Sequence, residues 1–220
     1  GDAPSAAQSG FANSYPVSVE DDGARHQVAG PRLGALATTE ANGANSVGAL
    51  GDDTNGTADD EDGILSVSTL IRSATVDTLA SITVDLQNPN ATSNKLDAWI
   101  DFNRDGDWDD AGEQILSSAN LGTTAGAVVL SFTIPAGSQV GETFARFRIS
   151  TTGGLTPRGF AFGGEVEDHA VTLIAAGQPS TVAPPGGGGA ITVAVIGSNI
   201  VITQDGLVLQ QIPVAGAGPI

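Results

Sequence analysis

The chain has 220 residues and a formal charge of −17, with 25 Asp and Glu against 8 Lys and Arg. This charge argues against nucleic acids and anionic membrane surfaces as partners, because both repel a strongly acidic protein. No cysteine is present, which excludes disulfides, thiolate metal sites and a thiol nucleophile. Apolar residues make up 40% of the chain, enough for a core, and no run approaches the roughly 18 apolar residues of a membrane span.

The 30 glycines, 11 prolines and single lysine disfavour long helices and favour turns between short strands. The chain also contains no methionine, even at position 1. We therefore expect a processed chain or a fragment, most simply a secreted protein that has lost its signal peptide, without membrane insertion.

Residues 1–63 are rich in turn-forming and acidic residues, and we expect extended structure there only at 17–20 and 32–36. From residue 64 onward the sequence has the alternation of half-buried strands. The predicted strands are 64–70, 80–86, 95–102, 127–134, 143–150 and 165–174. Strands at this spacing, with turn residues between them, predict an all-β antiparallel β-sandwich of jelly-roll or Ig-like type over residues 1–174, with long acidic loops.

A linker is predicted at residues 175–190, which contain two consecutive prolines and four consecutive glycines. Residues 191–220 then form a C-terminal extension of two or three short apolar strands. A unit this small is marginal in isolation, so we expect it either to dock on its own sandwich or to be donated to a neighbouring copy. The linker of about 16 residues could span roughly 50 Å when extended, enough to reach a neighbour.

The sharpest local signal is an oxygen-rich loop that follows the strand at 95–102. Side chains with oxygen atoms occupy alternating positions, and Gly106 stands at the sixth, where a loop wrapped around Ca²⁺ needs a sharp turn. The acid of an EF-hand would fall one residue before Glu113, and a strand precedes the loop, so we predict a calcium loop on a β framework. The alternative is a solvated, Asp-rich turn. The predicted ligands are Asp101, Asn103, Asp105, Asp107 and Glu113.

A second acidic stretch lies within residues 52–62. Two carboxylates 4 Å apart repel by about 4 kcal/mol at an effective dielectric near 20, and a bound cation would remove that repulsion. An oxygen-only ligand set suits Ca²⁺. The alternative is an exposed loop whose charges are solvated. The predicted ligands for further ions are Asp59, Asp60 and Asp62, with Asp21, Asp22 or Glu167 as additional candidates.

A third acidic group follows at 165–168, where Glu165 and Glu167 share one face of a strand. Arg146 and Arg148 share a face of the preceding strand. Either cross-strand ion pairs or metal ligation by part of the group would explain this arrangement. We expect at least one structural ion pair.

Short motifs occur in a fixed order along the first 174 residues. They read GDAP at 1–4, DDGARH at 21–26, LG at 33–34, GDD at 51–53, DDEDG at 59–63, AWIDFNRDG at 98–106, ARFRIS at 145–150 and GEVED at 164–168. Together they resemble the bacterial GEVED domain. The resemblance implies a β-sandwich module of secreted or surface-attached proteins, often within large adhesin-like chains, with no known catalysis. His169 departs from it, since the family usually has an aromatic residue there.

We predict that the protein is not an enzyme, because it lacks a thiol and a GxSxG elbow and its two histidines lie in segments with a structural pattern. We expect instead a calcium-stabilised subunit of an extracellular filament or adhesive matrix, in which residues 191–220 join copies head to tail. The alternative is a monomeric, calcium-dependent carbohydrate- or surface-binding module of an adhesin. In that case Trp99, Trp108 or Tyr15 would stack on a sugar ring.

Overall fold

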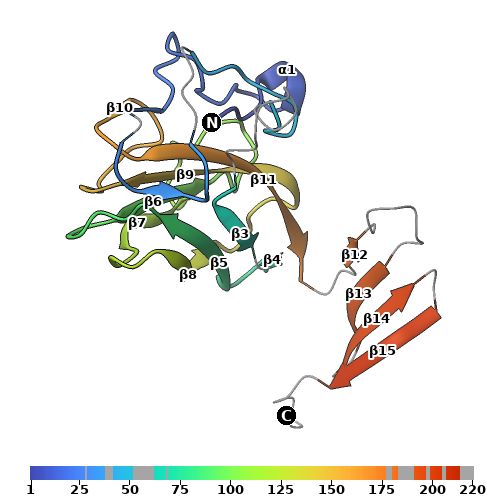
Figure 1. The fold of residues 1–220 in the computed structure, drawn as a ribbon. Coiled ribbons are helices and arrows are strands. Elements are labelled where there is room, and N and C mark those ends of the chain that lie inside the picture. Colours follow the sequence, from blue (N-terminus) through green and yellow to red (C-terminus); the bar gives the residue numbers. More distant parts are fainter. Residues whose placement is uncertain are drawn as a thin grey trace. The chain divides into compact units, whose positions relative to one another are not determined.

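The computed structural model describes residues 1–27, 29–37, 42–51, 62–67, 69–176, 180–182, 191–196, 199–204 and 207–213. In this part of the chain the regular structure is almost entirely β, with one short helix, α1 (Ala6–Ser9). The predicted all-β sandwich is confirmed (Figure 1). Two compact units are present, Gly1–Leu173 and Ile174–Ile220, and each is described separately.

The first layer of the sandwich is a five-stranded sheet in the order β4-β11-β9-β6-β7. Its central strand β9 pairs antiparallel with both β6 and β11. The strands are β4 (Leu70–Arg72), β6 (Lys95–Ile100), β7 (Gln114–Asn120), β9 (Gly141–Ser150) and β11 (Glu165–Ala175). From Thr143 to Ser150 every residue of β9 is buried, so both faces of the sheet are covered there.

The second layer is built on the long strand β5 (Thr78–Gln87). This strand pairs antiparallel with β2 (Arg32–Leu33), β3 (Ile64–Val67) and β8 (Gly126–Ile134). Alternate residues of β5 point inward and meet the facing side chains of β6 and β9 in one apolar core. These inward residues include Ile82, Val84 and Leu86 from β5, Leu96, Ala98 and Ile100 from β6, and Phe147 and Ile149 from β9.

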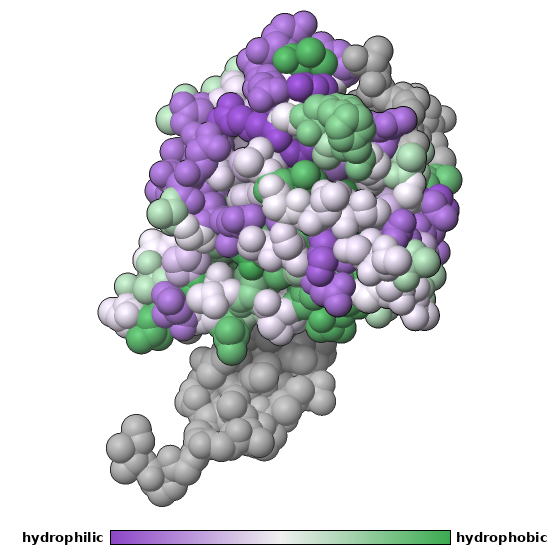
Figure 2. Space-filling view, turned by 90° about the vertical axis from the view of Figure 1, so that its left-hand side faces the viewer, coloured by the Kyte–Doolittle hydropathy of each residue, from purple (hydrophilic) through white to green (hydrophobic). Residues whose placement is uncertain are grey.

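The outer face of the five-stranded sheet is covered by the N-terminal segment, which crosses it at the end marked N in Figure 1. A second apolar cluster lies between them and is formed by Ala3, Tyr15, Val17, Ala49, Trp99, Trp108 and Phe144. Figure 2 shows that hydrophilic residues predominate at this end of the N-terminal unit, while hydrophobic residues become more frequent toward the opposite edge. This second cluster is why β9 is buried on both faces. Two short strands, β1 (Arg25–His26) and β10 (Phe160–Ala161), pair in parallel beside it.

Three details of the sandwich differ from the strand predictions. Residues 17–20 are not extended but enter a turn, in which the N–H groups of Asp21 and Gly23 donate to the Ser18 carbonyl. The strand predicted at 64–70 is divided between β3 and β4, which belong to different sheets. Strand β7 was not predicted, because its adjacent Ile115 and Leu116 break the alternation.

The C-terminal unit is an antiparallel meander in the order β12-β13-β14-β15. Its strands are β12 (Ser180–Val182), β13 (Ile191–Ile196), β14 (Asn199–Gln204) and β15 (Leu207–Pro213). The apolar strands expected beyond the linker therefore pair with one another, and β12 adds a strand inside the region predicted as linker. Residues 177–179 and 183–190 of that region lie outside the described residues.

Candidate metal centre

The loop between β6 and β7 is organised around the buried carboxylate of Asp101. Oδ1 accepts hydrogen bonds from the backbone N–H groups of Arg104 at 2.5 Å and Asp105 at 3.3 Å. Oδ2 accepts from the Gly106 N–H at 3.0 Å and from the Tyr15 hydroxyl at 2.5 Å. A carboxylate has about four acceptor positions. In this structure Asp101 therefore shapes the loop from inside and ties it to the N-terminal segment.

Three other aspartates of the loop direct oxygen atoms toward a common point. One carboxylate oxygen from each of Asp105, Asp107 and Asp110 lies within 4.8 Å of the others. Calcium binds oxygen at about 2.3–2.6 Å, so two ligands of one ion lie up to roughly 5 Å apart and this set fits the ion. Partial burial, followed by the charge of Asp107, raises the pKa of Asp105. Repulsion between these groups is what a cation would relieve.

Asp105 and Asp107 were predicted as ligands, whereas Asp110 was missed. The neighbouring Asp109 does not join the group, because its carboxylate pairs with Arg158 at 2.5 Å. Asp110 reaches the group because the chain reverses after it, where the Glu113 N–H donates to the Asp110 carbonyl at 3.3 Å. A turn that breaks the alternation leaves no sign in the spacing of acidic residues.

The other two predicted ligands hold the loop together in this structure. Asn103 donates from Nδ2 to Asp110 Oδ2 at 2.5 Å and accepts from the Asp105 N–H at 3.1 Å. Glu113 is buried, and its two oxygens accept from the backbone N–H groups of Phe102 at 3.0 Å and Asp110 at 3.3 Å. Burial, followed by the nearby charge of Asp101, raises the pKa of Glu113 to about 8. Through these two hydrogen bonds, Glu113 connects the start of the loop at Phe102 to its end at Asp110.

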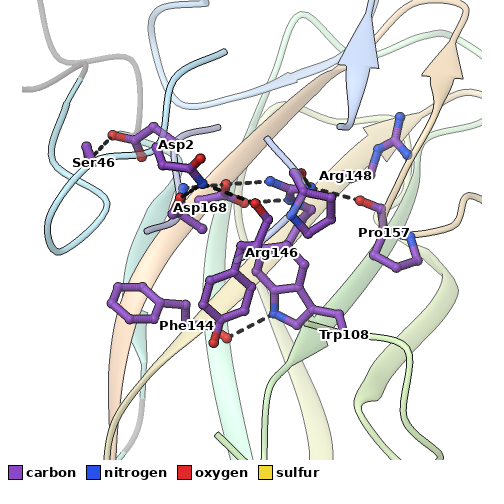
Figure 3. A network of polar contacts seen from close by, with 12 residues as sticks. Asp2, Ser46, Trp108, Phe144, Arg146, Arg148, Pro157 and Asp168 are labelled. Carbon is purple, nitrogen blue, oxygen red and sulfur yellow. Dashed lines mark hydrogen bonds and ion pairs between the residues drawn. The ribbon is translucent and has the colours of Figure 1, made fainter. Parts of the chain in front are cut away.

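A buried polar network connects this loop to the GEVED peptide (Figure 3). Trp108 donates from its indole N–H to the Phe144 carbonyl at 3.1 Å, and the Arg146 guanidinium lies 4.3 Å from the centre of the Trp108 ring. Arg146 forms two hydrogen bonds of 2.7 Å with the Asp168 carboxylate, which is fully buried. The expected cross-strand ion pair is thus present. Burial alone would raise the pKa of Asp168, but Arg146 outweighs it and holds that pKa below its usual value.

The N-terminal segment is fastened to the same network. The Ala3 N–H donates to Asp168 Oδ2 at 3.0 Å. The neighbouring Asp2 is buried, and its Oδ2 accepts from the Ser46 hydroxyl and the Gly51 N–H, both at 2.5 Å. Asp168 therefore hydrogen-bonds both to Arg146 of strand β9 and to Ala3 of the N-terminal segment that covers the sheet.

The second predicted metal region is described only in part. Asp59 and Asp60, together with Asp52 and Asp53, lie outside the described residues. Asp62 accepts the Ala35 N–H at 3.0 Å, and its Oδ1 is buried with no hydrogen-bond partner among the described residues.

Two acids of the GEVED peptide meet Asp62 where residues 33–35, 62–63 and β11 converge. Glu165 accepts the Leu33 N–H, while Glu167 accepts the Gly63 N–H at 3.1 Å and bonds to His169 at 2.9 Å. Burial, then the charge of Glu167, raises the pKa of Glu165 to about 9. Burial also raises the pKa of Glu167. The structure thus brings together two predicted ligands, Asp62 and Glu167, and adds Glu165, which belongs to the acidic group for which both ion pairing and metal ligation were left open.

Asp21 and Asp22 lie apart, in an exposed turn. Asp21 accepts from the Ser18 hydroxyl at 2.8 Å, and Asp22 pairs with Arg25 at 2.9 Å. Among the described residues, the acids whose carboxylate oxygens lie within 4.8 Å of one another are Asp105, Asp107 and Asp110, and neither Asp21 nor Asp22 is among them.

Both histidines have structural contacts. His26 accepts a hydrogen bond at Nε2 from Arg148 Nε at 3.0 Å, so its proton lies on Nδ1. Nδ1 therefore donates to the Gly163 carbonyl at 2.9 Å. Burial, followed by the charge of Arg148, lowers the pKa of His26 to about 3. The remaining donors of Arg148 bond to carbonyls that include those of Thr156 and Gly159.

The aromatic residues proposed for sugar stacking are all buried. Tyr15, Trp99 and Trp108 belong to the cluster beneath the N-terminal segment and are at most 3% exposed. Phe160 and Phe162 are the strongly exposed aromatics instead, at 54% and 79%, and their rings meet edge to face at 5.0 Å. A sugar-binding surface on this unit would therefore use different residues from those predicted.

Comparison with known proteins supports the resemblance seen in the sequence motifs. Neither the curated proteins nor the solved structures include a match to the chain. None of the helices in the described part of the chain has the length and apolarity needed to cross a membrane. The family model of the GEVED domain matches residues 95–172, a segment that runs from β6 into β11 and contains both the oxygen-rich loop and the GEVED peptide. The resemblance to the GEVED domain is therefore confirmed over residues 95–172.

Proposed function

We propose that this protein is a secreted, calcium-stabilised structural module of an extracellular filament or adhesive matrix, joined to neighbouring copies through residues 191–220. The observation that carries the calcium part is the convergence of Asp105, Asp107 and Asp110 within 4.8 Å. The GEVED match suggests a module of extracellular type. Extracellular calcium modules bind with Kd of about 10⁻⁴–10⁻³ M, which suits a site of three carboxylates.

Calcium at this position would act on the fold rather than on a substrate. The loop is already bonded to the N-terminal segment, since the Asn13 N–H donates to the Asp105 carbonyl at 2.7 Å and Asn13 Nδ2 donates to Asp107 Oδ2 at 3.2 Å. An ion that cancels the repulsion among the three carboxylates would hold both the loop and this contact in place. The ion would thereby strengthen the cover over the outer face of the five-stranded sheet.

Calorimetric titration of the full chain with CaCl₂ tests this site. We expect binding in the millimolar to submillimolar range, and a loss of about tenfold or more in affinity for Asp105→Asn and Asp110→Asn, because each removes one ligand charge. Asp109→Asn is the matched control, since Asp109 lies in the same loop but pairs with Arg158. Calcium affinity that is unchanged in both ligand variants would reject this site, and no binding at millimolar calcium would reject the calcium part of the proposal.

The alternative is a monomeric module that binds a carbohydrate or a surface. It is favoured by one observation, the exposed pair of Phe160 and Phe162. Loss of glycan or cell-surface binding in Phe162→Ser, for a chain that sediments as a monomer, would favour this alternative over assembly.

A further inference from the structure

The strand register of the C-terminal unit places most of its large aliphatic residues on one face of the sheet. Val193 pairs with Ile202, Val195 with Ile200, and Ile200 with Ile212. Residues that pair directly share a face, and successive residues of a strand alternate between faces. The aliphatic face defined in this way carries Val182, Ile191, Val193, Val195, Ile200, Ile202, Leu207 and Ile212, together with Ser180, Gln204 and Gln210.

The opposite face has a mixed composition. Its positions are Thr181, Thr192, Ala194, Ile196, Asn199, Val201, Thr203, Val208, Gln211 and Pro213. This contrast between the two faces is typical of a sheet that buries one side and exposes the other. Within residues 174–220, however, the described strands make a single sheet, so the unit itself contributes no second layer among the residues described. An apolar sheet face needs a partner layer to form a stable core.

Charge distinguishes the possible partner layers. Residues 174–220 contain one charged side chain, Asp205, so nearly all of the charge of −17 belongs to residues 1–173. An apolar face that meets an acidic surface strips water from carboxylates, and this is costly unless they are paired. The same face of a second copy is aliphatic and uncharged. A second copy therefore offers a partner layer that requires no desolvation of carboxylates.

The size of the sheet sets the expected strength of such a contact. With strands about 4.8 Å apart and a rise of about 3.4 Å per residue, three strands of six or seven residues and one of three residues cover about 360 Å². Two copies would bury about 700 Å² before the area of the projecting side chains is added, which is in the range of weak, transient contacts below about 1,200 Å². We therefore expect a reversible dimer.

We propose that the aliphatic faces of two copies pack against each other across a two-fold axis and form an intermolecular β-sandwich. This inference rests on the part of the proposed function in which residues 191–220 join neighbouring copies. It differs from strand donation, because the strands of each copy stay paired with one another and the contact is complete with two copies. A filament would need a further contact elsewhere on the molecule.

Sedimentation of the full chain over a range of concentrations tests the proposal. We expect the mass to rise from 21.9 kDa toward twice that value. Ile202→Asp places a charge on the aliphatic face and should weaken dimerisation about tenfold or more. Val201→Asp, the adjacent residue on the opposite face, is the matched control and should still dimerise. A wild-type chain that stays monomeric, or equal loss in both variants, would overturn the proposal.

A second measurement controls for the possibility that the charge introduced by Ile202→Asp unfolds the sheet. The chain has no cysteine, so Ile202→Cys and Val201→Cys each provide a single thiol. A short bis-maleimide should link Ile202→Cys into a covalent dimer and leave Val201→Cys monomeric, whereas equal cross-linking of both would contradict face-to-face packing. Calcium titration of the same variants separates the two claims, because their calcium affinity should be unchanged even if dimerisation is absent.

Discussion

The region around the GEVED peptide contains a buried ion pair between Arg146 and Asp168. The side chains of Arg146 and Asp168 are 1% and 0% exposed. Their two hydrogen bonds of 2.7 Å lie at the short end of the range for a guanidinium and a carboxylate. Arg146 also donates to the carbonyls of Pro16 and Pro157, both at 2.8 Å. The pair is therefore buried and hydrogen-bonded on both sides, and loss of one partner leaves an uncompensated charge in the interior.

Asp168→Asn should destabilise the N-terminal unit by about 3–5 kcal/mol, because Arg146 then remains buried without its counter-charge. Asp109→Asn removes the partner of Arg158 in an exposed ion pair and should cost about 1 kcal/mol or less. Urea unfolding of both variants measures the difference. Equal, small effects would show that the buried pair does not carry the stability assigned to it.

His26 should make stability fall in acid. The pKa of His26 is about 3 in the folded protein, against an ordinary value of 6.5. Between pH 6.5 and pH 3 the unfolded chain therefore binds a proton at His26 that the folded chain does not bind. Stability should fall as the pH drops from 6.5 toward 3, by at most about 1.4 kcal/mol per pH unit from this group.

His26→Gln isolates that contribution, because glutamine keeps an acceptor for Arg148 but does not titrate. The stability advantage of the wild type over the variant should be larger at pH 8 than at pH 5 in urea unfolding. The raised pKa values of Glu113 and Glu165 act in the opposite direction, with stability lost as the pH rises through them, but both groups are present in the two proteins. A difference that does not change with pH would contradict the assignment.

At the scale of elements, the oxygen-rich loop depends on close contact with the N-terminal segment. Gly106 has φ of +96°, and a Cβ there would lie 2.3 Å from the carbonyl oxygen of Asn13. That contact leaves no room for any side chain. The loop and the segment therefore form one structural element, although 93 positions separate Gly106 from Asn13 in the sequence.

Gly106→Ala should therefore destabilise the fold by more than backbone strain alone. Gly122→Ala is the matched control, since Gly122 also has a positive φ, +80°, but no atom within 4 Å of the added Cβ. We expect about 1–2 kcal/mol for Gly122→Ala from the left-handed backbone, and a clearly larger loss for Gly106→Ala. Thermal unfolding compares them, and equal losses would show that the contact with Asn13 is dispensable.

Alternation in the sequence predicted the elements that form the sandwich core, because β5, β6, β8, β9 and β11 each place apolar side chains in it. It failed where long-range contacts decide the structure. The division between β3 and β4 depends on which sheet each strand joins, and the turn at 17–20 depends on hydrogen bonds to Ser18. For the site, spacing identified Asp105 and Asp107. Asp110 joins them through a chain reversal, and Glu165 is placed by a long-range contact with Leu33, neither of which spacing encodes.

At the scale of the whole molecule, charge is distributed very unevenly between the two units. Residues 1–173 carry nearly all of the charge of −17, whereas residues 174–220 contain one charged side chain. Self-repulsion of that size destabilises a compact state. In the proposed function, calcium lowers this cost in the N-terminal unit, and the uncharged C-terminal sheet provides the surface through which acidic units can associate.

The measurement that tests this account most directly is scanning calorimetry of the full chain in about 10 mM CaCl₂ and in chelator. With calcium at about 10–100 times its Kd, binding to the folded state should add about 1.4–2.7 kcal/mol of stability, and the unfolding temperature should rise by several degrees. The same shift should persist in Asp109→Asn and shrink in Asp105→Asn. An unfolding temperature of the wild type that is identical in calcium and in chelator would contradict the account.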